Sequence, residues 1–271
     1  SETVLSLDMA DNSDDRIRLT LSRSTGFMLD VDLRLPSGGV TVLFGVSGCG
    51  KTTVLRSAAG LEKAQGYVRI AGQVWQDDEK HLFVPTYKRR IGYVFQEASL
   101  FDHLNVRENL RFGLKRISDE DGEKRLDDAV ELLGIGHLLE RRTSELSGGE
   151  RQRCAIARSL AIKPTALFMD EPLAALDHAR RLEIVPWIDR LRKELNLPIL
   201  YVTHSEEEVM RLADRLAVID NGKLIDNGPV AETWLHLMQK KGRKASRLLL
   251  VMGTVEERDS AWSLMKVVSR S

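Results

Sequence analysis

The glycine-rich segment that follows Val40–Phe44 has residue types suited to binding phosphate groups. It matches the pattern GxxxxGK[ST], with a short β-rich apolar run before it and helix-forming residues from Lys51 onward. Glycines let the backbone wrap closely around an anion, so that successive N–H groups and the N-terminus of the next helix face it. The alternative is an ordinary glycine-rich turn, which the flanking strand and helix disfavour. The predicted nucleotide-binding residues are Gly45, Val46, Ser47, Gly48, Cys49, Gly50, Lys51, Thr52 and Thr53.

Two side chains of this loop would act on the phosphates directly. Lys51 is suited to neutralising the β and γ phosphates, which makes it a catalytic candidate as well as a binding residue. The hydroxyl of Thr52 is suited to Mg²⁺, which bridges the same phosphates and takes up charge as the bond to the leaving group breaks. The loop therefore predicts a nucleotide and a magnesium ion.

A pair of carboxylates follows the buried-strand run Ala166–Met169. Ligands of open α/β sheets bind at the carboxyl ends of the strands, which is where Asp170 and Glu171 would stand. Asp170 is suited to holding Mg²⁺, and Glu171, one residue further out, is suited to accepting a proton from an attacking water. Taken alone the pair could be a surface acidic turn, but together with the phosphate loop it predicts a hydrolytic site.

A second small-residue loop, Leu146–Glu150, precedes the helical run Arg151–Leu160. Its residues Ser147, Gly148 and Gly149 could form another anion-binding helix end, although such a segment is by itself more often a helix cap. One nucleotide needs only one cradle. We therefore expect the second cradle to complete the site of another copy of the chain, so that two nucleotides lie between two copies facing head to tail.

The order of these motifs resembles that of ABC ATPases, whose signature motif is similar to Leu146–Glu150, and the resemblance covers about residues 3 to 235. It implies ATP and Mg²⁺ as cofactors and a chain that hydrolyses ATP. It also implies that Gln96 senses Mg²⁺ and the water, that Leu173–Asp177 passes information between two sites, and that His204 contacts the γ-phosphate. The family stacks adenine on an upstream aromatic residue, for which Phe27 is the one aromatic residue before Phe44, in a poorly fitting register.

Within that family the chain is similar to bacterial molybdate importers in segments such as Lys88–Gln96 and Asn109–Gly113. Asp102 stands where those importers commonly have proline, so sulfate, tungstate, a polyamine or a sugar stays open as the solute. The resemblance implies integral membrane permease subunits as partners and, indirectly, a periplasmic or surface solute-binding protein. A permease helix would dock in a groove beside Gln96, Leu100 and Phe101. The alternative is that the apolar residues Leu100 and Phe101 belong to the core of the helical region.

The elements that position these residues are those of an α/β fold. Buried-strand runs separated by amphipathic helices predict a P-loop NTPase core with a mainly parallel sheet, and turns at Ala71–Gln73 and Asn221-Gly222 add antiparallel strands. A charged helical stretch predicts an inserted helical subdomain. We expect the core at 3–95 and 162–235, the helical subdomain with the signature at 96–161, and a linker with a remnant of a regulatory β-domain at 236–271.

The C-terminal region would hold little more than one hairpin, from Thr254–Glu257 and Ser263–Val268. Molybdate importers often carry an oxyanion-binding β-domain there, and two strands are too few to stand alone. A truncated or vestigial regulatory domain, or a chain cut short, is therefore expected.

Composition limits the other possibilities. Forty basic and forty acidic residues balance, so no net field draws the chain to nucleic acid, and no nucleic-acid partner is expected. No apolar run approaches the roughly 18 to 20 residues that cross a bilayer, and no leader segment is apparent. The chain is expected in the cytosol, at the cytoplasmic face of the inner membrane through a partner. Cys49 and Cys154 form neither a disulfide framework nor a zinc site.

Two rival functions are weaker. An ABC-type ATPase of DNA repair or translation would usually carry long coiled coils or two linked ATPase halves, which this sequence does not show. A small-molecule kinase or GTPase would have no use for the cradle at Ser147. Because Cys49 lies in the phosphate loop, we expect a bulky thiol reagent to inhibit hydrolysis and Mg-ATP to protect.

Overall fold

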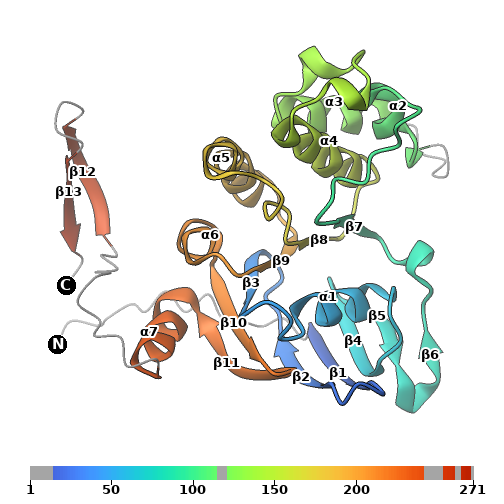
Figure 1. Ribbon diagram of the computed structural model, residues 1–271, viewed down its shortest axis with the longest axis vertical. Coiled ribbons are helices and arrows are strands. Elements are labelled where there is room, and N and C mark those ends of the chain that lie inside the picture. Colours follow the sequence, from blue (N-terminus) through green and yellow to red (C-terminus); the bar gives the residue numbers. More distant parts are fainter. Residues whose placement is uncertain (1–14, 115–120, 241–252, 260–263, 270–271) are drawn as a thin grey trace. The chain divides into compact units, whose positions relative to one another are not determined.

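The computed structural model describes residues 15–114, 121–240, 253–259 and 264–269 (Figure 1). It divides into two compact units, Ser1–Val230 and Ala231–Ser271. The first unit contains a mixed sheet of parallel and antiparallel strands in the order β6-β5-β4-β1-β2-β11-β10-β3-β9-β8-β7. The expected α/β class with a P-loop core is therefore confirmed.

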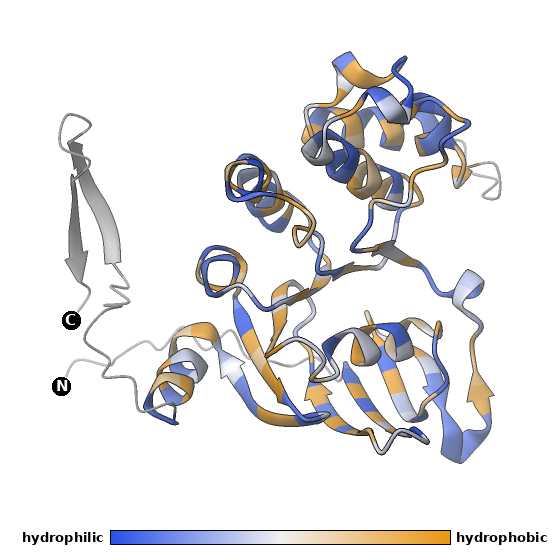
Figure 2. Ribbon diagram, viewed as in Figure 1, coloured by the Kyte–Doolittle hydropathy of each residue, from blue (hydrophilic) through white to orange (hydrophobic). Residues whose placement is uncertain are grey.

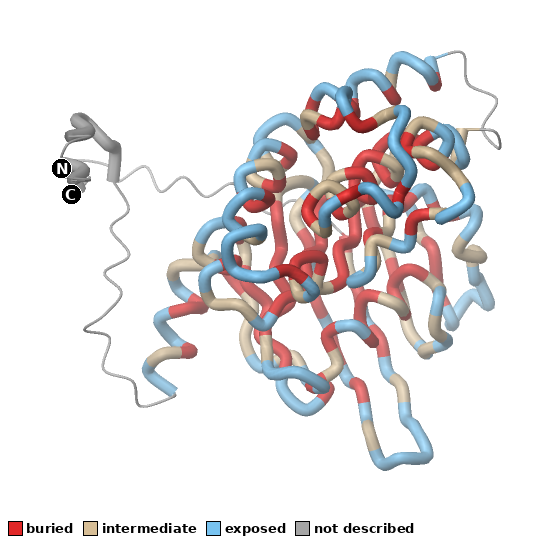
Figure 3. The backbone as a smooth tube through the Cα atoms, turned by 45° about the horizontal axis from the view of Figure 1, so that its top comes forward, coloured by how far each residue is buried: buried red, intermediate tan, exposed pale blue. Residues whose placement is uncertain are grey.

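The parallel half of the sheet carries the buried runs foreseen in the sequence. Its neighbouring strands all pair in parallel register. They are β10 (Arg215–Asp220), β3 (Gly39–Phe44), β9 (Pro198–Thr203), β8 (Ala166–Asp170) and β7 (Ile91–Val94). Every residue of β8 and β9 is buried, which is the pattern of strands covered on both faces. Figure 3 shows this buried centre as a band of red strands inside paler loops.

The antiparallel half is larger than the sequence suggested. It consists of β1 (Arg16–Ser22), β2 (Met28–Arg34), β4 (Gln65–Ile70), β5 (Gln73–Asp77) and the short β6 (Leu82–Phe83), and β11 (Lys223–Pro229) joins it to the parallel half. β2 alternates buried and exposed residues, and β1 does so over most of its length, as strands with one wet face do. The hairpin turns at Ala71-Gly72 and Asn221-Gly222 lie where the sequence predicted them.

Helices pack around the sheet of this unit, and Figure 2 shows hydrophilic and hydrophobic stripes along them. The helices of the core are α1 (Lys51–Ala59), α5 (His178–Glu194) and α6 (Glu206–Leu212). A separate helical group follows β7 and contains α2 (Val106–Arg111), α3 (Gly122–Leu132) and α4 (Gly148–Ala161) (Figure 1). Short 3₁₀ turns are η1 (Asp78–Lys80), η2 (Thr86–Lys88), η4 (Gly136–Leu138) and η5 (Thr143–Glu145).

The second unit contains most of α7 (Val230–Lys240) and a hairpin of β12 (Gly253–Asp259) and β13 (Leu264–Ser269). Both strands lie close to the predicted ranges, and Ser263 falls outside the described residues. Among the helices that the structure describes, none combines the length and the apolar character needed to cross a membrane.

Candidate functional site

The phosphate loop joins the end of β3 to the start of α1. Gly48 and Gly50 have φ values of +79° and +111°, which L side chains rarely adopt. Gly50 is the N-cap of α1 and offers no side chain to cap it, so the first N–H groups of the helix stay available to an anion. A Cβ atom at Gly50 would lie 3.0 Å from the ring of Phe27. The fold thus requires glycine where the sequence pattern has it.

Lys51 is buried by the loop that it serves. Its side chain is 3% exposed, and Nζ donates hydrogen bonds of 2.9 Å to the backbone oxygens of Gly45 and Val46. The same Nζ lies 3.7 Å from Oε1 of Glu171. The ammonium group is therefore fixed at the mouth of the loop beside the acidic pair.

Thr52 and Asp170 lie side by side although 118 residues separate them in the chain. The hydroxyl of Thr52 donates to Oδ1 of Asp170 at 2.7 Å, and the hydroxyl of Tyr93 donates to Oδ2 at 3.1 Å. Burial raises the pKa of Asp170 above its usual value, and burial also raises the pKa of Tyr93. Oxygen donors on a buried carboxylate and a hydroxyl fit a hard divalent cation, whose charge would offset the cost of burying the carboxylate. The residues present therefore fit Mg²⁺.

Glu171 has a strained backbone, and the side chains of Lys51 and His204 lie beside its carboxylate. Its φ is +44°, and its N–H donates to the carbonyl of Val202 at 3.1 Å, which ties it to β9. Oε2 lies 3.3 Å from Nδ1 of His204. Non-glycine residues in the left-handed region cost energy and cluster at active sites. The structure therefore brings Lys51, Glu171 and His204 together, and their catalytic roles stay a prediction.

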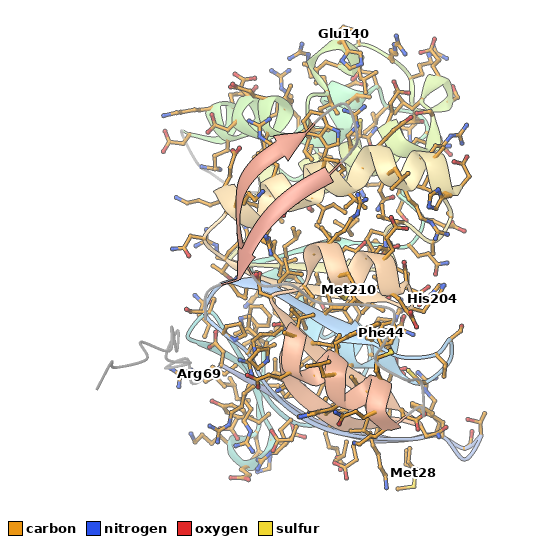
Figure 4. All side chains as sticks on the ribbon, turned by 90° about the vertical axis from the view of Figure 1, so that its left-hand side faces the viewer. Met28, Phe44, Arg69, Glu140, His204 and Met210 are labelled. Carbon is orange, nitrogen blue, oxygen red and sulfur yellow. The ribbon has the colours of Figure 1, made fainter. Side chains whose placement is uncertain are left out.

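His204 follows β9, next to the strand that enters the phosphate loop. Phe44 of β3 and Thr203 of β9 are register partners, and Figure 4 labels Phe44 and His204 near each other. The His204 side chain is 51% exposed, whereas that of Glu171 is 16% exposed. The imidazole can thus meet a ligand that approaches from solvent.

The signature segment, Leu146–Glu150, lies at the start of α4. The hydrogen bonds described for Ser147 and Glu150 join these two residues to each other and not to Lys51, Glu171 or His204. Ser147 is the N-cap: its hydroxyl accepts from the Glu150 N–H at 3.3 Å, and its own N–H donates to Oε2 of Glu150 at 2.7 Å. Those hydrogen bonds to Ser147 lower the pKa of Glu150. The segment is thus a helix cap, and a second role for Ser147, Gly148 and Gly149 on a partner's nucleotide stays a prediction. Gln96 is exposed two residues after β7, and its role also stays a prediction.

Two expectations change. Cys49 is only 4% exposed, so a bulky reagent has poor access to its thiol. Burial also raises the pKa of this thiol, which leaves less of the reactive thiolate. Leu100 is buried and Phe101 stacks on Phe112 with ring centroids 4.3 Å apart, which places both in the packing of the helical group. Asp102 accepts hydrogen bonds from Thr143 and Arg151 at 3.2 Å each.

Sequence reasoning missed two tyrosines that donate hydrogen bonds to carboxylates, one to Asp170 of the site and one to Glu208 of α6. Tyr93 contacts Asp170, and Tyr201 of β9 donates to Oε2 of Glu208 at 2.8 Å. No local motif marks either residue, because each partner comes from another element. Only the buried-strand positions of the two tyrosines could have drawn attention to them.

Comparisons with known proteins find relatives of this chain in sequence and in fold. A family model described as "ABC transporter" matches residues 28–174. Among curated relatives, the molybdenum import ATP-binding protein ModC of Thiobacillus denitrificans is 54% identical over 245 residues, covering 89% of this chain and 67% of the relative. ModC of Methylococcus capsulatus is 56% identical over 247 residues, with the same coverage. ModC of Pseudomonas aeruginosa is 50% identical over 256 residues, covering 94% of this chain and 71% of the relative.

Two solved structures share the fold. The cbiO1 protein of Clostridium perfringens, part of the ABC transporter complex cbiONQ, superposes with a TM-score of 0.71 at 28% identity, covering 86% of this chain and 97% of that one. A dimeric ATP-binding cassette in a post-hydrolysis state, bound to ADP and Pi, gives a TM-score of 0.64 at 25% identity, covering 80% and 98%.

Proposed function

The chain belongs to the ABC transporter family, and on that premise we propose that it is the ATP-hydrolysing subunit of a molybdate importer. Transport-coupled ATP hydrolysis follows from the family, whereas the solute rests on the ModC relatives. Their identity of 50% or more over most of this chain supports molybdate over sulfate, a polyamine or a sugar. A non-transport ABC ATPase has no comparable support.

The contact that carries the proposal is the position of Glu171 between Lys51 Nζ, at 3.7 Å, and His204 Nδ1, at 3.3 Å. In this arrangement the loop backbone and Lys51 hold the β and γ phosphates of ATP. Glu171 accepts a proton from the water whose oxygen attacks the γ phosphorus, and the bond to the β-γ bridging oxygen breaks. His204 donates to the γ-phosphate and holds the Glu171 carboxylate in place.

Thr52, Asp170 and Gln96 are the residues proposed to hold Mg²⁺. The oxygens of Thr52 and Asp170 already lie 2.7 Å apart. The bound ion would neutralise charge on the phosphates during transfer. Tyr93, which donates to the second oxygen of Asp170, keeps that carboxylate turned toward Thr52.

A second copy of the chain completes each site in this proposal. Ser147, Gly148 and Gly149 at the N-terminus of α4 would grip the γ-phosphate bound by the other copy. Closing the dimer would move the helical region (96–161) relative to the core (3–95 and 162–235). The movement would be passed, at the cytoplasmic face of the membrane, to integral membrane permease subunits. A solute-binding protein would deliver the solute to these subunits from the other side of the membrane.

Reconstitution with a permease tests this function. The chain should co-purify with an integral membrane subunit. Vesicles that contain both should transport molybdate only when ATP is present on the side of the membrane where the chain is bound. Lys51→Ala should abolish uptake while the complex still assembles. Uptake of sulfate, a polyamine or a sugar in place of molybdate would overturn the solute, and failure to bind any membrane subunit would overturn the transport role.

A further inference from the structure

A small polar cavity adjoins the carboxylate of Glu171. Its volume is about 10 Å³, which is close to the space that one water molecule needs. The polar side chains that line it come from the end of β8, from α5, from the end of β9 and from α6. They are Glu171, Arg181, Thr203, His204, Ser205 and Glu208. A cavity with this many polar partners suits a bound water.

Glu208 is the lining carboxylate that the reaction described above does not use. It is 5% exposed, although a buried carboxylate is costly unless it is paired or hydrogen-bonded. Its Oε2 accepts a 2.8 Å hydrogen bond from the hydroxyl of Tyr201, which is itself fully buried in β9. Burial, with Glu208 adding to it, raises the pKa of Tyr201, so this hydroxyl stays a donor. The hydrogen bond from Tyr201 therefore holds the Glu208 carboxylate in one position.

The turn between β9 and α6 directs Glu208 toward the catalytic pair. The N–H of Ser205 donates to Oγ1 of Thr203 at 3.0 Å, and the N–H of Glu208 donates to Oγ of Ser205 at 3.3 Å. These bonds hold the backbone on both sides of His204, so the imidazole and the Glu208 carboxylate face the same cavity. His204 and Glu208 are therefore carried by one hydrogen-bonded turn.

Arg181 supplies positive charge to a cavity that two carboxylates face. Its Nε donates to the carbonyl of Leu176 at 3.0 Å, which anchors it at the end of the segment that follows Glu171. A water in this cavity would have Arg181, Glu171 and Glu208 as polar partners and would join them through its hydrogen bonds. The cavity thus offers a bridge between Glu171 and the buried Glu208.

We propose that Glu208 is a positioning residue of the hydrolytic site, which holds the Glu171 carboxylate in its working position beside His204 through one water bound in this cavity. The inference rests on the proposed role of Glu171 as the base. It predicts that Glu208 acts on the rate of hydrolysis rather than on ATP binding, because the hydrogen bonds described for Glu208 join it to Tyr201 and Ser205 and not to the phosphate loop.

The test is Glu208→Gln in the full chain, measured by steady-state ATP hydrolysis. The amide oxygen can still accept from Tyr201, so the fold is preserved while the charge is lost. We expect kcat to fall about tenfold, as small displacements of a catalytic group do, with KM for ATP within about twofold and an unchanged Tm. Glu207→Gln is the matched control, because it removes one charge from the same helical turn on the exposed side, and it should keep kcat.

A Glu171→Gln background separates this inference from the proposed function. If Glu208 acts through Glu171, adding Glu208→Gln to Glu171→Gln should lower the residual rate no further. A wild-type kcat in Glu208→Gln, or a fall matched by a lower Tm, would overturn the inference, as would an additive loss in the double variant. If Glu171→Gln itself hydrolysed ATP at full speed, the proposed base would fail first. Should Glu208→Gln not fold, Tyr201→Phe should lower kcat by a smaller factor at constant KM, and an unchanged kcat there would also overturn the inference.

Discussion

Replacing Gly222 with alanine tests how the phosphate loop is held from behind. The N–H of Gly222 donates to the carbonyl of Cys49 at 2.8 Å, and its carbonyl accepts from the N–H of Asp30 at 2.8 Å. Its φ is +76°, and a Cβ atom there would overlap the backbone oxygen of Met28. Because the overlapping atom belongs to the backbone, the Gly222 turn and the β2 backbone at Met28 must move apart, which disturbs the contacts of the turn.

The cost can be worked from these contacts. The left-handed conformation costs an alanine about 1–2 kcal/mol. Moving the turn weakens two hydrogen bonds, each contributing about 0.5–1.5 kcal/mol. The total is about 3 kcal/mol, and in a domain of this size about 1 kcal/mol shifts Tm by about 2–4 °C, so we expect a loss of about 6–12 °C. Displacement of the Cys49 carbonyl should also weaken ATP binding several-fold.

Gly72→Ala is the matched control. Gly72 is also the second residue of a hairpin turn, with φ +74°, but a Cβ atom there would meet nothing within 4 Å. It should pay only the left-handed cost of about 1–2 kcal/mol and leave ATP affinity unchanged. Thermal unfolding and equilibrium ATP binding of both variants check the prediction. Equal losses of Tm with unchanged ATP affinity in both would refute the idea that the Gly222 turn supports the loop.

Three further predictions concern buried polar groups. Because burial raises the pKa of Asp170, its charge lowers the stability of the nucleotide-free protein at neutral pH, and this penalty is relieved as pH falls through that raised pKa. Asp170→Asn should therefore be at least as stable as the wild type at pH 7 without nucleotide, and the difference in Tm between the two should shrink toward pH 4. The variant should gain no stability from Mg-ATP. Thermal scans that show a large loss of Tm at pH 7 would contradict this. Cys49 should be alkylated slowly in the folded chain and rapidly in denaturant, as followed by mass spectrometry, and equal rates would show that its thiol is accessible. Burial lowers the pKa of Arg89 to about 10, and its guanidinium donates hydrogen bonds to the carbonyls of Val84 and Ala58. Arg89→Leu should therefore lower the free energy of unfolding, measured with denaturant, by about 2–4 kcal/mol. A loss below about 1 kcal/mol would be inconsistent with those hydrogen bonds.

Local patterns predicted the parts of the fold that depend on local chemistry. The strand, loop and helix around Lys51, the buried run that ends at Asp170 and the turn at Asn221-Gly222 each follow from residue types a few positions apart. The strands β1 and β2 were missed, although the alternation of Ile17 with Leu19 and of Leu29 with Val31 was a visible signal.

Contacts between distant segments could not be predicted in the same way. Tyr93 meets Asp170 across 77 residues, because parallel pairing sets β7 beside β8. The burial of Cys49 likewise depends on the β10–β11 turn, whose Gly222 binds its carbonyl. Nothing in the short pattern around either residue encodes these partners, which only the assembled sheet supplies.

The nucleotide-dependent mass of the Glu171→Gln variant tests the central claim, that two copies of the chain must join to complete each ATP site. With ATP, this variant should sediment as a stable species of twice the 30.5 kDa chain mass, and Ser147→Arg added to it should abolish that species without abolishing ATP binding. A variant that binds ATP and stays at the mass of one chain, while the wild type hydrolyses ATP at a rate per chain that does not depend on concentration, would contradict the account.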